Sequence, residues 1–311
     1  MKAIRYTLAA ALTVFAAASC QDNITPEQNS ESGIIINATI ENTQTKTVLG
    51  EGVLGSDGKV HHKVLWKNND DISVFDANGN NKRFRTYVKG DHETAKFQQI
   101  ANDYDTTTFV PADYYHAIYP GKSSNSINME TKAITTTIPD LQTPVLNGFA
   151  DDLAVAYGFG TAQRYEENTS NGPRTYIDMT FKNATALIKI ELTSGDITEV
   201  RFLDQNNNYL GGSLSFTYQN DEIQVTGGDK KYIFLNKSEE IEEKKYNYTP
   251  IEPGVYYIVI AAPATPIKPR IDLHTDTTHT SSKINGGYPT TIKGKNEVSL
   301  KPGMILDLGK F

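Results

Sequence analysis

The stretch from Gly33 to Glu41 has the sequence Gly-Ile-Ile-Ile-Asn-Ala-Thr-Ile-Glu and gives the clearest indication of the fold. Its alternate residues are apolar and share one parity: Ile34, Ile36, Ala38 and Ile40. Asn37, Thr39 and Glu41 lie on the opposite parity, together with Ile35. A period of two is typical of a β-strand with one buried face. The stretch therefore predicts a strand that contributes its isoleucines to a core.

Short segments of the same kind continue along the chain and are separated by turns rich in Gly, Pro and Asn. Long segments with a helical period of 3.6 are absent, although the charge run 238–245 could be a short helix or an exposed loop. The pattern therefore predicts an all-β fold of two tandem β-sandwiches. The polar stretch 163–173 has no apolar period and is the best boundary. We expect one sandwich over residues 33–165 and a second over 174–311. The unbroken apolar run Val255–Ile260 predicts a central strand that is buried on both faces.

The N-terminus is typical of an export signal. Lys2 and Arg5 precede a short apolar run at 8–18, and small residues lead directly to Cys20, the only cysteine. This order predicts a bacterial lipoprotein signal over residues 1–20, with the Cys20 thiol as the lipidation site. A general secretory signal with an incidental cysteine is the alternative. Residues 21–32 are polar and contain proline, which predicts a flexible tether.

Composition excludes several classes of protein. The chain has 30 basic and 37 acidic residues and a net charge of −7, which argues against nucleic acid as a partner. Once Cys20 is lipidated no thiol remains for a disulfide, so stability has to come from burial and sheet hydrogen bonds. No further apolar run approaches membrane-spanning length, so lipid is the only expected membrane tie.

Motifs for catalysis, cofactors or metals are weak. No zinc-protease, P-loop or nucleophile-elbow motif occurs, so we expect no catalytic residues, no cofactor and no enzyme activity. His61 with His62 and His274 with His279 are expected to be loop histidines and not metal ligands. The segment Asp76–Gly79 could be a calcium loop or a hairpin turn, and the turn fits the early glycine better. Trp66 could be a stacking platform for a sugar or a core anchor, and its apolar neighbours favour the core.

The end of the chain carries a second alternating stretch. Its apolar residues share one parity: Val298, Leu300, Met304, Leu306 and Leu308. The protein therefore begins and ends with strands that could fill the same kind of groove.

Several sequence blocks, taken in order, resemble the fimbrillin (Mfa-like) family of Bacteroides-group bacteria. They span nearly the whole mature chain and begin with Cys20, followed by the segments 66–75, 115–120, 152–156, 181–190, 256–263 and 300–308. The resemblance implies two transthyretin-like β-sandwich domains and a subunit of a type V pilus. It also implies a lipidated precursor at the outer membrane, from which a trypsin-like protease removes the first strand.

For this chain, the resemblance implies a displaced strand made of Ile34, Ile36, Ala38 and Ile40, with cleavage between Lys46 and Thr47. Best-known stalk members are cut after Arg, so an uncut loop lysine in a tip, anchor or non-polymerising member remains open. The donor strand would be Val298, Leu300, Met304, Leu306 and Leu308. The expected partners are other fimbrillin subunits, of the same or a related chain, the outer membrane through lipid, and an unidentified host or bacterial surface ligand. The alternative is a monomeric surface lipoprotein that binds glycan or host protein.

Overall fold

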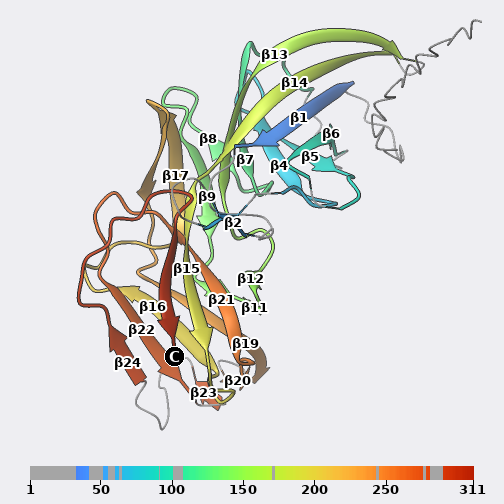
Figure 1. Ribbon diagram of the computed structural model, residues 1–311. Coiled ribbons are helices and arrows are strands. Elements are labelled where there is room, and N and C mark those ends of the chain that lie inside the picture. The colour runs from blue at the N-terminus through green and yellow to red at the C-terminus, as the bar shows by residue number, and fades with distance from the viewer. Residues whose placement is uncertain are drawn as a thin grey trace, which may run out of the picture.

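The computed structural model describes residues 33–41, 52–54, 60–62, 65–90, 92–100, 108–169, 172–242, 245–275, 278–280 and 290–311. These residues form β-strands joined by turns and loops, and none of them is helical (Figure 1). Accordingly, no helix capable of crossing a membrane occurs within these ranges. The prediction of an all-β fold is confirmed.

The N-terminal half is built on a sheet that closes on itself. In order around the ring, its strands are β1 (Ile34–Ile40), β14 (Gly172–Asn183), β13 (Ala156–Thr169), β7 (Tyr114–Tyr119), β4 (Asp71–Phe75), β5 (Asn81–Thr86) and β6 (Thr94–Gln99). Apolar side chains from every strand fill its interior, because alternate residues of each strand point inward. β1 closes the ring, since it pairs with β14 on one side and β6 on the other.

A second sheet packs against the closed sheet. It consists of β18 (Glu222–Gly227), β17 (Gly212–Gln219), β9 (Ile134–Ile138) and β8 (Ser126–Ile127). Phe216 of β17 and Ile134 of β9 share a buried cluster with Ile118 of β7 and Tyr157 of β13. Residues from both halves of the chain therefore build one interface.

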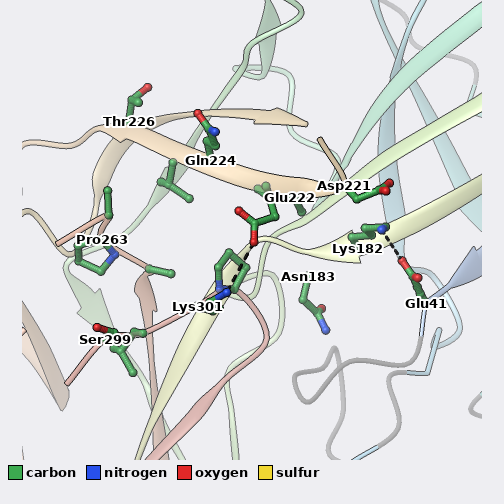
Figure 2. A pocket seen from close by; sticks show the side chains of 16 residues that line it. Glu41, Lys182, Asn183, Asp221, Glu222, Gln224, Thr226, Pro263, Ser299 and Lys301 are labelled. Carbon is green, nitrogen blue, oxygen red and sulfur yellow. Dashed lines mark ion pairs between the residues drawn. The ribbon is translucent and has the colours of Figure 1, made fainter. Parts of the chain in front are cut away.

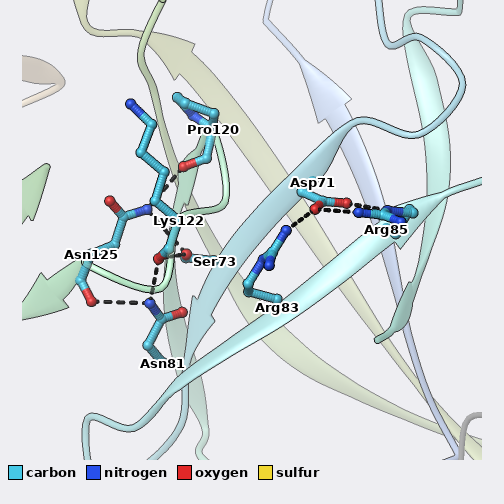
Figure 3. Close-up of polar contacts among 8 residues, drawn as sticks. All are labelled: Asp71, Ser73, Asn81, Arg83, Arg85, Pro120, Lys122 and Asn125. Atoms are coloured by element: carbon cyan, nitrogen blue, oxygen red, sulfur yellow. Dashed lines mark hydrogen bonds and ion pairs between the residues drawn. The ribbon is translucent and has the colours of Figure 1, made fainter. Parts of the chain in front are cut away.

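Asn125 links β4 of the closed sheet to β9 of the second sheet. Figure 3 shows its contacts with Ser73 and Pro120. Asn125 is 3% exposed and donates to the Ser73 hydroxyl of β4 and the Pro120 carbonyl, while its own carbonyl accepts from the Thr136 hydroxyl of β9. A buried amide needs such partners, because leaving it unpaired costs free energy. On the same face of the closed sheet, Asp71 of β4 forms ion pairs with Arg83 and Arg85 of β5 (Figure 3).

Two further sheets pack face to face in the C-terminal part, below the closed sheet in Figure 1. One consists of β21 (Gly254–Ala261), β15 (Thr185–Leu192) and β25 (Ile305–Lys310). The other contains β23 (Thr278–Thr280), β20 (Lys245–Thr249), β19 (Tyr232–Glu242), β16 (Glu199–Asp204), β22 (Pro269–His274) and β24 (Thr290–Lys293). Their facing side chains form a continuous buried core. Short strands complete the described structure: β2 (Gly52–Leu54), β3 (Val60–His62), β10 (Leu141–Gln142), β11 (Pro144–Val145) and β12 (Gly148–Phe149).

The apolar run at 255–260 is buried on both faces as expected, but it is not central. Ile258 and Ile260 join one core cluster, and Tyr257 and Val259 join another. β21 nevertheless lies at the end of its sheet and pairs with β15 alone. The side-chain amide of Gln142 meets its outer edge: it donates to the Val259 carbonyl at 2.7 Å and accepts from the Val259 N–H at 2.9 Å. A buried amide side chain thus replaces a neighbouring strand.

The polar stretch 163–173 differs from its expected role as a boundary. It lies at the far end of the long hairpin of β13 and β14, whose pairing runs out to Thr169 opposite Gly172 (Figure 1). β14 therefore belongs to the closed sheet of the N-terminal half. The chain crosses to the C-terminal sheets only after Asn183, where β15 begins at Thr185. A polar sequence without an apolar period is therefore compatible with an extended hairpin as well as with a linker.

Two loops in the two halves have the same construction. Asp76 follows β4 and accepts from the N–H groups of residues two and four positions later, from the side chain of Asn80, and from the Val110 N–H. Asp204 at the end of β16 accepts from the equivalent groups of Asn206 and Asn208 and from the Lys268 N–H. The residue three positions after the aspartate has a positive φ in both loops: Gly79 in one and Asn207 in the other. The same turn is therefore used once in each half.

Candidate functional site

β1 is held by backbone hydrogen bonds on both edges. It runs parallel to β14, with Ile36 opposite Ile177, and antiparallel to β6, with Ile36 opposite Phe97. The pairing extends beyond the strand, because Thr175 N–H donates to the Gly33 carbonyl at 2.8 Å and Glu41 N–H to the Phe181 carbonyl at 2.8 Å. Taking β1 away would leave β6 and β14 as two facing open edges.

The inner face of β1 lies in the core of the closed sheet. The four residues predicted for this face are 8% exposed or less and belong to its buried cluster: Ile34, Ile36, Ala38 and Ile40. Burying an isoleucine side chain stabilises the fold by about 1.5–3 kcal/mol. The isoleucines therefore add side-chain burial to the backbone pairing that holds β1 in the closed sheet.

The outer face of β1 makes polar contacts with its two neighbours. Asn37 donates to the Asp178 carboxylate of β14 at 2.7 Å, and the Thr39 and Thr94 hydroxyls are 3.1 Å apart. Ile35 lies on this face too but is only 5% exposed, which the simple alternation did not predict. Beyond the strand, Glu41 forms an ion pair with Lys182 of β14 at 3.0 Å.

Trp66 connects the core to the backbone of β1. Its ring is fully buried, and its indole N–H donates to the Ala38 carbonyl at 3.1 Å. Three aromatic rings meet it edge to face at 4.9–5.6 Å: Phe97, Tyr119 and Phe181. A buried indole cannot stack on a sugar, so the structure excludes the platform and supports the core anchor.

Asp70 closes the turn that follows Trp66. The residue is 8% exposed. Its carboxylate accepts a hydrogen bond from the Lys67 N–H at 2.7 Å and another from the Tyr119 hydroxyl at 3.3 Å. Burial raises the pKa of Asp70 to about 7, and the Lys67 hydrogen bond opposes that shift. The turn that positions Trp66 therefore carries a carboxyl group that titrates near neutral pH.

We expect this carboxyl to make stability depend on pH. The folded protein holds the Asp70 proton at pH values where the unfolded chain has lost it, so this contribution is complete below about pH 4 and is lost as the pH rises to about 7. The slope is up to about 1.4 kcal/mol per pH unit in that window. Asp70→Asn should remove this pH dependence, because an amide does not titrate, and it keeps one oxygen that can accept from the Lys67 N–H. Urea unfolding of both proteins from about pH 4 to about pH 7 measures the free energy of unfolding. Equal slopes of that free energy against pH in the two proteins would contradict the prediction.

A cavity of about 640 Å³ lies at the end of β1 (Figure 2). Its lining includes Glu41 and Lys182 from the β1–β14 side, the β18 strand, and residues 299–302, which lead into β25. A second ion pair joins Lys301 to Glu222 at 3.6 Å, between the segment before β25 and the β17–β18 hairpin (Figure 2). The structure thus brings the end of the predicted displaced strand and the start of the predicted donor strand to one cavity.

The predicted donor residues do not form one continuous strand. Val298 pairs with Ile267 as an isolated bridge, and a turn at Pro302–Gly303 interrupts the extended backbone, with φ of +85° at Gly303. β25 then begins at Ile305 and runs parallel to β15. Pro302 has no N–H to give to a ladder and glycine tolerates a positive φ, so this pair is a turn within the alternation.

Four of the five donor side chains share one environment. Leu300 is buried in the C-terminal core, and Val298, Leu306 and Leu308 are half-buried against it. Met304 is half-buried beside the turn, at the point where its carbonyl accepts from the Leu187 N–H. For the other four residues, the parity noted in the sequence corresponds to one face of the C-terminal sandwich.

Two predicted sites lie outside the described residues. They are the lipidation site Cys20 and the processing site Lys46–Thr47. The described backbone ends at Glu41 on one side of the processing site and resumes at Gly52 on the other.

The candidate metal sites do not assemble within the described ranges, where no group of three or more His, Cys, Asp or Glu could hold an ion. His274, expected in a loop, ends strand β22 and is buried, with its Nε2 3.9 Å from the Glu199 carboxylate. Both carboxylate oxygens of Asp76 accept hydrogen bonds from N–H donors, so the loop is a turn. These bonds leave no free carboxylate oxygen as a calcium ligand. His61, His62 and His279 lie in β3 and β23.

No protein-family model matches this sequence, and no curated protein matches it either. Solved structures do resemble the fold. One is a Bacteroides ovatus protein assigned provisionally to cell adhesion, with 13% identity over 89% of this chain and 91% of its own, and a TM-score of 0.44. A similarly assigned Bacteroides uniformis protein has 12% identity over 86% and 91% of the two chains, with a TM-score of 0.40. The fimbrial anchor protein Mfa2 of Porphyromonas gingivalis has 8% identity over 78% of each chain, with a TM-score of 0.30. At these values the similarity alone does not establish a function.

Proposed function

We propose that this chain is a fimbrillin-like adhesion subunit of two tandem transthyretin-like sandwiches, assembled at the cell surface by strand exchange. The observation that carries the proposal is the position of β1, the strand that closes the ring between β6 and β14. In the proposed cycle, β1 acts as a plug that proteolysis removes, and a strand from another fimbrillin subunit, of the same or a related chain, takes its place. The repeated Asp turn supports the tandem arrangement.

The energetics favour replacement over an empty groove. Without β1, the rings of Trp66 and Phe97 and the side chain of Met179 would lose the apolar partner that covers them. Two rows of unpaired N–H and C=O groups would open as well, which is a template for another strand. An incoming strand with apolar residues at every second position restores both kinds of contact, as in strand addition.

β25 suits the role of the donor. It is an edge strand with one neighbour, whereas β1 has two. Leu306 and Leu308 are half-buried, whereas Ile36 and Ala38 are fully buried. Less free energy therefore holds β25 in its own subunit than would hold an apolar strand in the groove of β1. A flattened turn at Pro302–Gly303 would extend the donor back to Val298.

The proposed precursor is anchored by lipid on Cys20 in the outer membrane and released by cleavage between Lys46 and Thr47. Lys46 follows the last residue of β1 by only a few positions, so cleavage there separates β1 from the rest of the chain without cutting any strand of the ring. The released subunit would enter a fimbrium, and its ligand is a host or bacterial surface molecule.

Limited trypsin treatment of the precursor tests this proposal. We expect an early cut whose new N-terminus is Thr47, followed by SDS-resistant oligomers on a gel. Lys46→Gln should abolish both results, because trypsin needs the basic side chain. Lys96→Gln is the matched control, since Lys96 is an exposed lysine on β6, next to β1, and should leave both results unchanged. A precursor that stays uncut, or is cut at Lys46 and remains monomeric, would count against strand exchange.

A further inference from the structure

A second cavity, of about 440 Å³, opens beside β7 and shares no residue with the cavity at the end of β1. Its walls come from the loop after β4, the segment that leads into β7, and the β8–β9 connection. Apolar side chains form much of the lining, with Met129 37% exposed at its edge. Asp76, Asp113, His116 and Lys132 supply charged or polar groups. Few polar groups in an apolar hollow are typical of a small-ligand site.

The hydrogen bonds around His116 fix its tautomer. The Tyr157 hydroxyl donates to the Lys132 carbonyl at 3.0 Å, and its oxygen is 2.8 Å from His116 Nδ1. A hydroxyl has a single proton, so Nδ1 must be the donor in the contact with Tyr157. Nε2 is then the unprotonated nitrogen. Among the residues that the structure describes, none donates to it, and His116 lines the cavity.

The ring of His116 stays neutral under ordinary conditions. Burial, together with the nearby Lys132 ammonium, lowers the pKa of His116 to about 4. The charged or titratable groups around it are Lys132 from the β8–β9 connection, Tyr157 from β13, Tyr114 from its own strand, and Asp113 and Asp76 across the cavity. Nε2 therefore offers a lone pair to a ligand that brings its own proton.

Tyr114 adds a fixed aromatic surface to the same cavity. The residue is 44% exposed, although it belongs to a strand inside the closed sheet. The edge of the ring packs against His116, with centroids 5.0 Å apart at 66°. An exposed ring held by a neighbour loses little conformational freedom when a ligand covers it.

We propose that this cavity binds a sugar residue of a glycan, with the apolar C–H face of the sugar on the Tyr114 ring and a sugar hydroxyl donating to His116 Nε2. A sugar combines an apolar face with hydroxyl donors, as these two side chains require. A neutral ligand suits this lining, because Nε2 carries no proton and the cavity is lined by both Lys132 and Asp113, whose charges offset each other. The proposal does not depend on strand exchange, because the cavity is complete in the monomer.

The test is binding of the uncut monomer to a panel of methyl glycosides of glucose, galactose, mannose, fucose and N-acetylglucosamine, measured by saturation-transfer NMR and titration. We expect at least one glycoside to bind, and Tyr114→Ala and His116→Phe to weaken it about tenfold or more. The matched control is Tyr232→Ala, because Tyr232 is also 44% exposed and packs edge to face, against Phe234 on β19. Thermal melting checks that each variant is folded.

The pH dependence provides a second readout. We expect the affinity to stay constant from about pH 8 to about pH 5.5, whereas a histidine with an ordinary pKa near 6.5 would titrate within that range. No binding by any glycoside at millimolar concentration would overturn the proposal. The proposal would also be overturned if Tyr114→Ala left the binding unchanged. The same holds if methyl acetate or an N-acetylated peptide bound as well as the glycoside.

Discussion

We expect Trp66→Ala to lower the free energy of unfolding by about 3–5 kcal/mol, because it removes the largest fully buried side chain of the closed sheet. Three aromatic rings lose their edge-to-face partner at once. The Ala38 carbonyl also loses its donor while it remains buried, which costs about 1–3 kcal/mol where no water replaces it. Urea unfolding followed by far-UV circular dichroism measures the change, since the variant has no tryptophan left for fluorescence.

Two controls separate the contributions in this prediction. Trp66→Phe keeps an aromatic ring but removes the indole N–H, so we expect a smaller loss and faster trypsin cleavage after β1. Phe202→Ala removes an equally buried ring from the C-terminal core. It should lower stability by a similar amount but leave the cleavage rate after β1 unchanged. If Phe202→Ala raised the rate of trypsin cleavage after β1 as much as Trp66→Phe does, the indole hydrogen bond of Trp66 would not be what retains β1.

Strands with alternating apolar and polar residues could be predicted from the sequence, because a strand with one buried face needs an apolar residue at every second position. β1 is the clearest case, and its four inner residues lie in the core as expected. Ile35 shows the limit of the method, because alternation alone cannot reveal that the outer face is covered at that point. Trp66 could be assigned to the core for a similar reason, but its hydrogen bond to Ala38 joins segments 28 residues apart and leaves no sequence pattern.

Pairing between strands was the part that the sequence could not provide. The stretch 163–173 has the composition of a linker, yet the long pairing of β13 with β14 places it at a hairpin end. β21 has the composition of a central strand, yet Gln142 takes the place of its second neighbour. Both results depend on contacts between residues that are distant in sequence, and local composition carries no record of them.

Some signals were present in the sequence but were not used. Asp76, Asn78 and Asn80 recur as Asp204, Asn206 and Asn208 with the same spacing, and the structure shows why: both loops satisfy one aspartate with N–H groups from positions two and four. Gly158 is another case. A Cβ there would lie 2.6 Å from the Phe181 ring, so the glycine makes room for a ring that packs on Trp66. A glycine within an apolar strand is a sign of such a close approach.

We expect Ile36→Asp to release β1 from the closed sheet. Ile36 is fully buried between Ile177 and Phe97, so the change removes about 1.5–3 kcal/mol of burial. It also places a carboxylate among the apolar side chains of the buried cluster, which costs several kcal/mol more unless the strand leaves the core. Release of β1 would hydrate the new charge, so we expect the change to shift the balance toward the released strand.

Thr39→Asp is the matched control, because it places the same charge on the exposed face of the same strand. Trypsin digestion with N-terminal sequencing gives the rate of cleavage at Lys46, and gel electrophoresis after the cut gives the yield of SDS-resistant oligomers. For Ile36→Asp we expect faster cleavage and earlier oligomers than for the unaltered chain, whereas Thr39→Asp should behave as the unaltered chain does. Circular dichroism should show that the C-terminal sheets remain folded, because β1 makes no pairing with them. Equal cleavage rates for the two variants would mean that β1 is not the element that keeps the groove closed, and strand exchange would lose its structural basis.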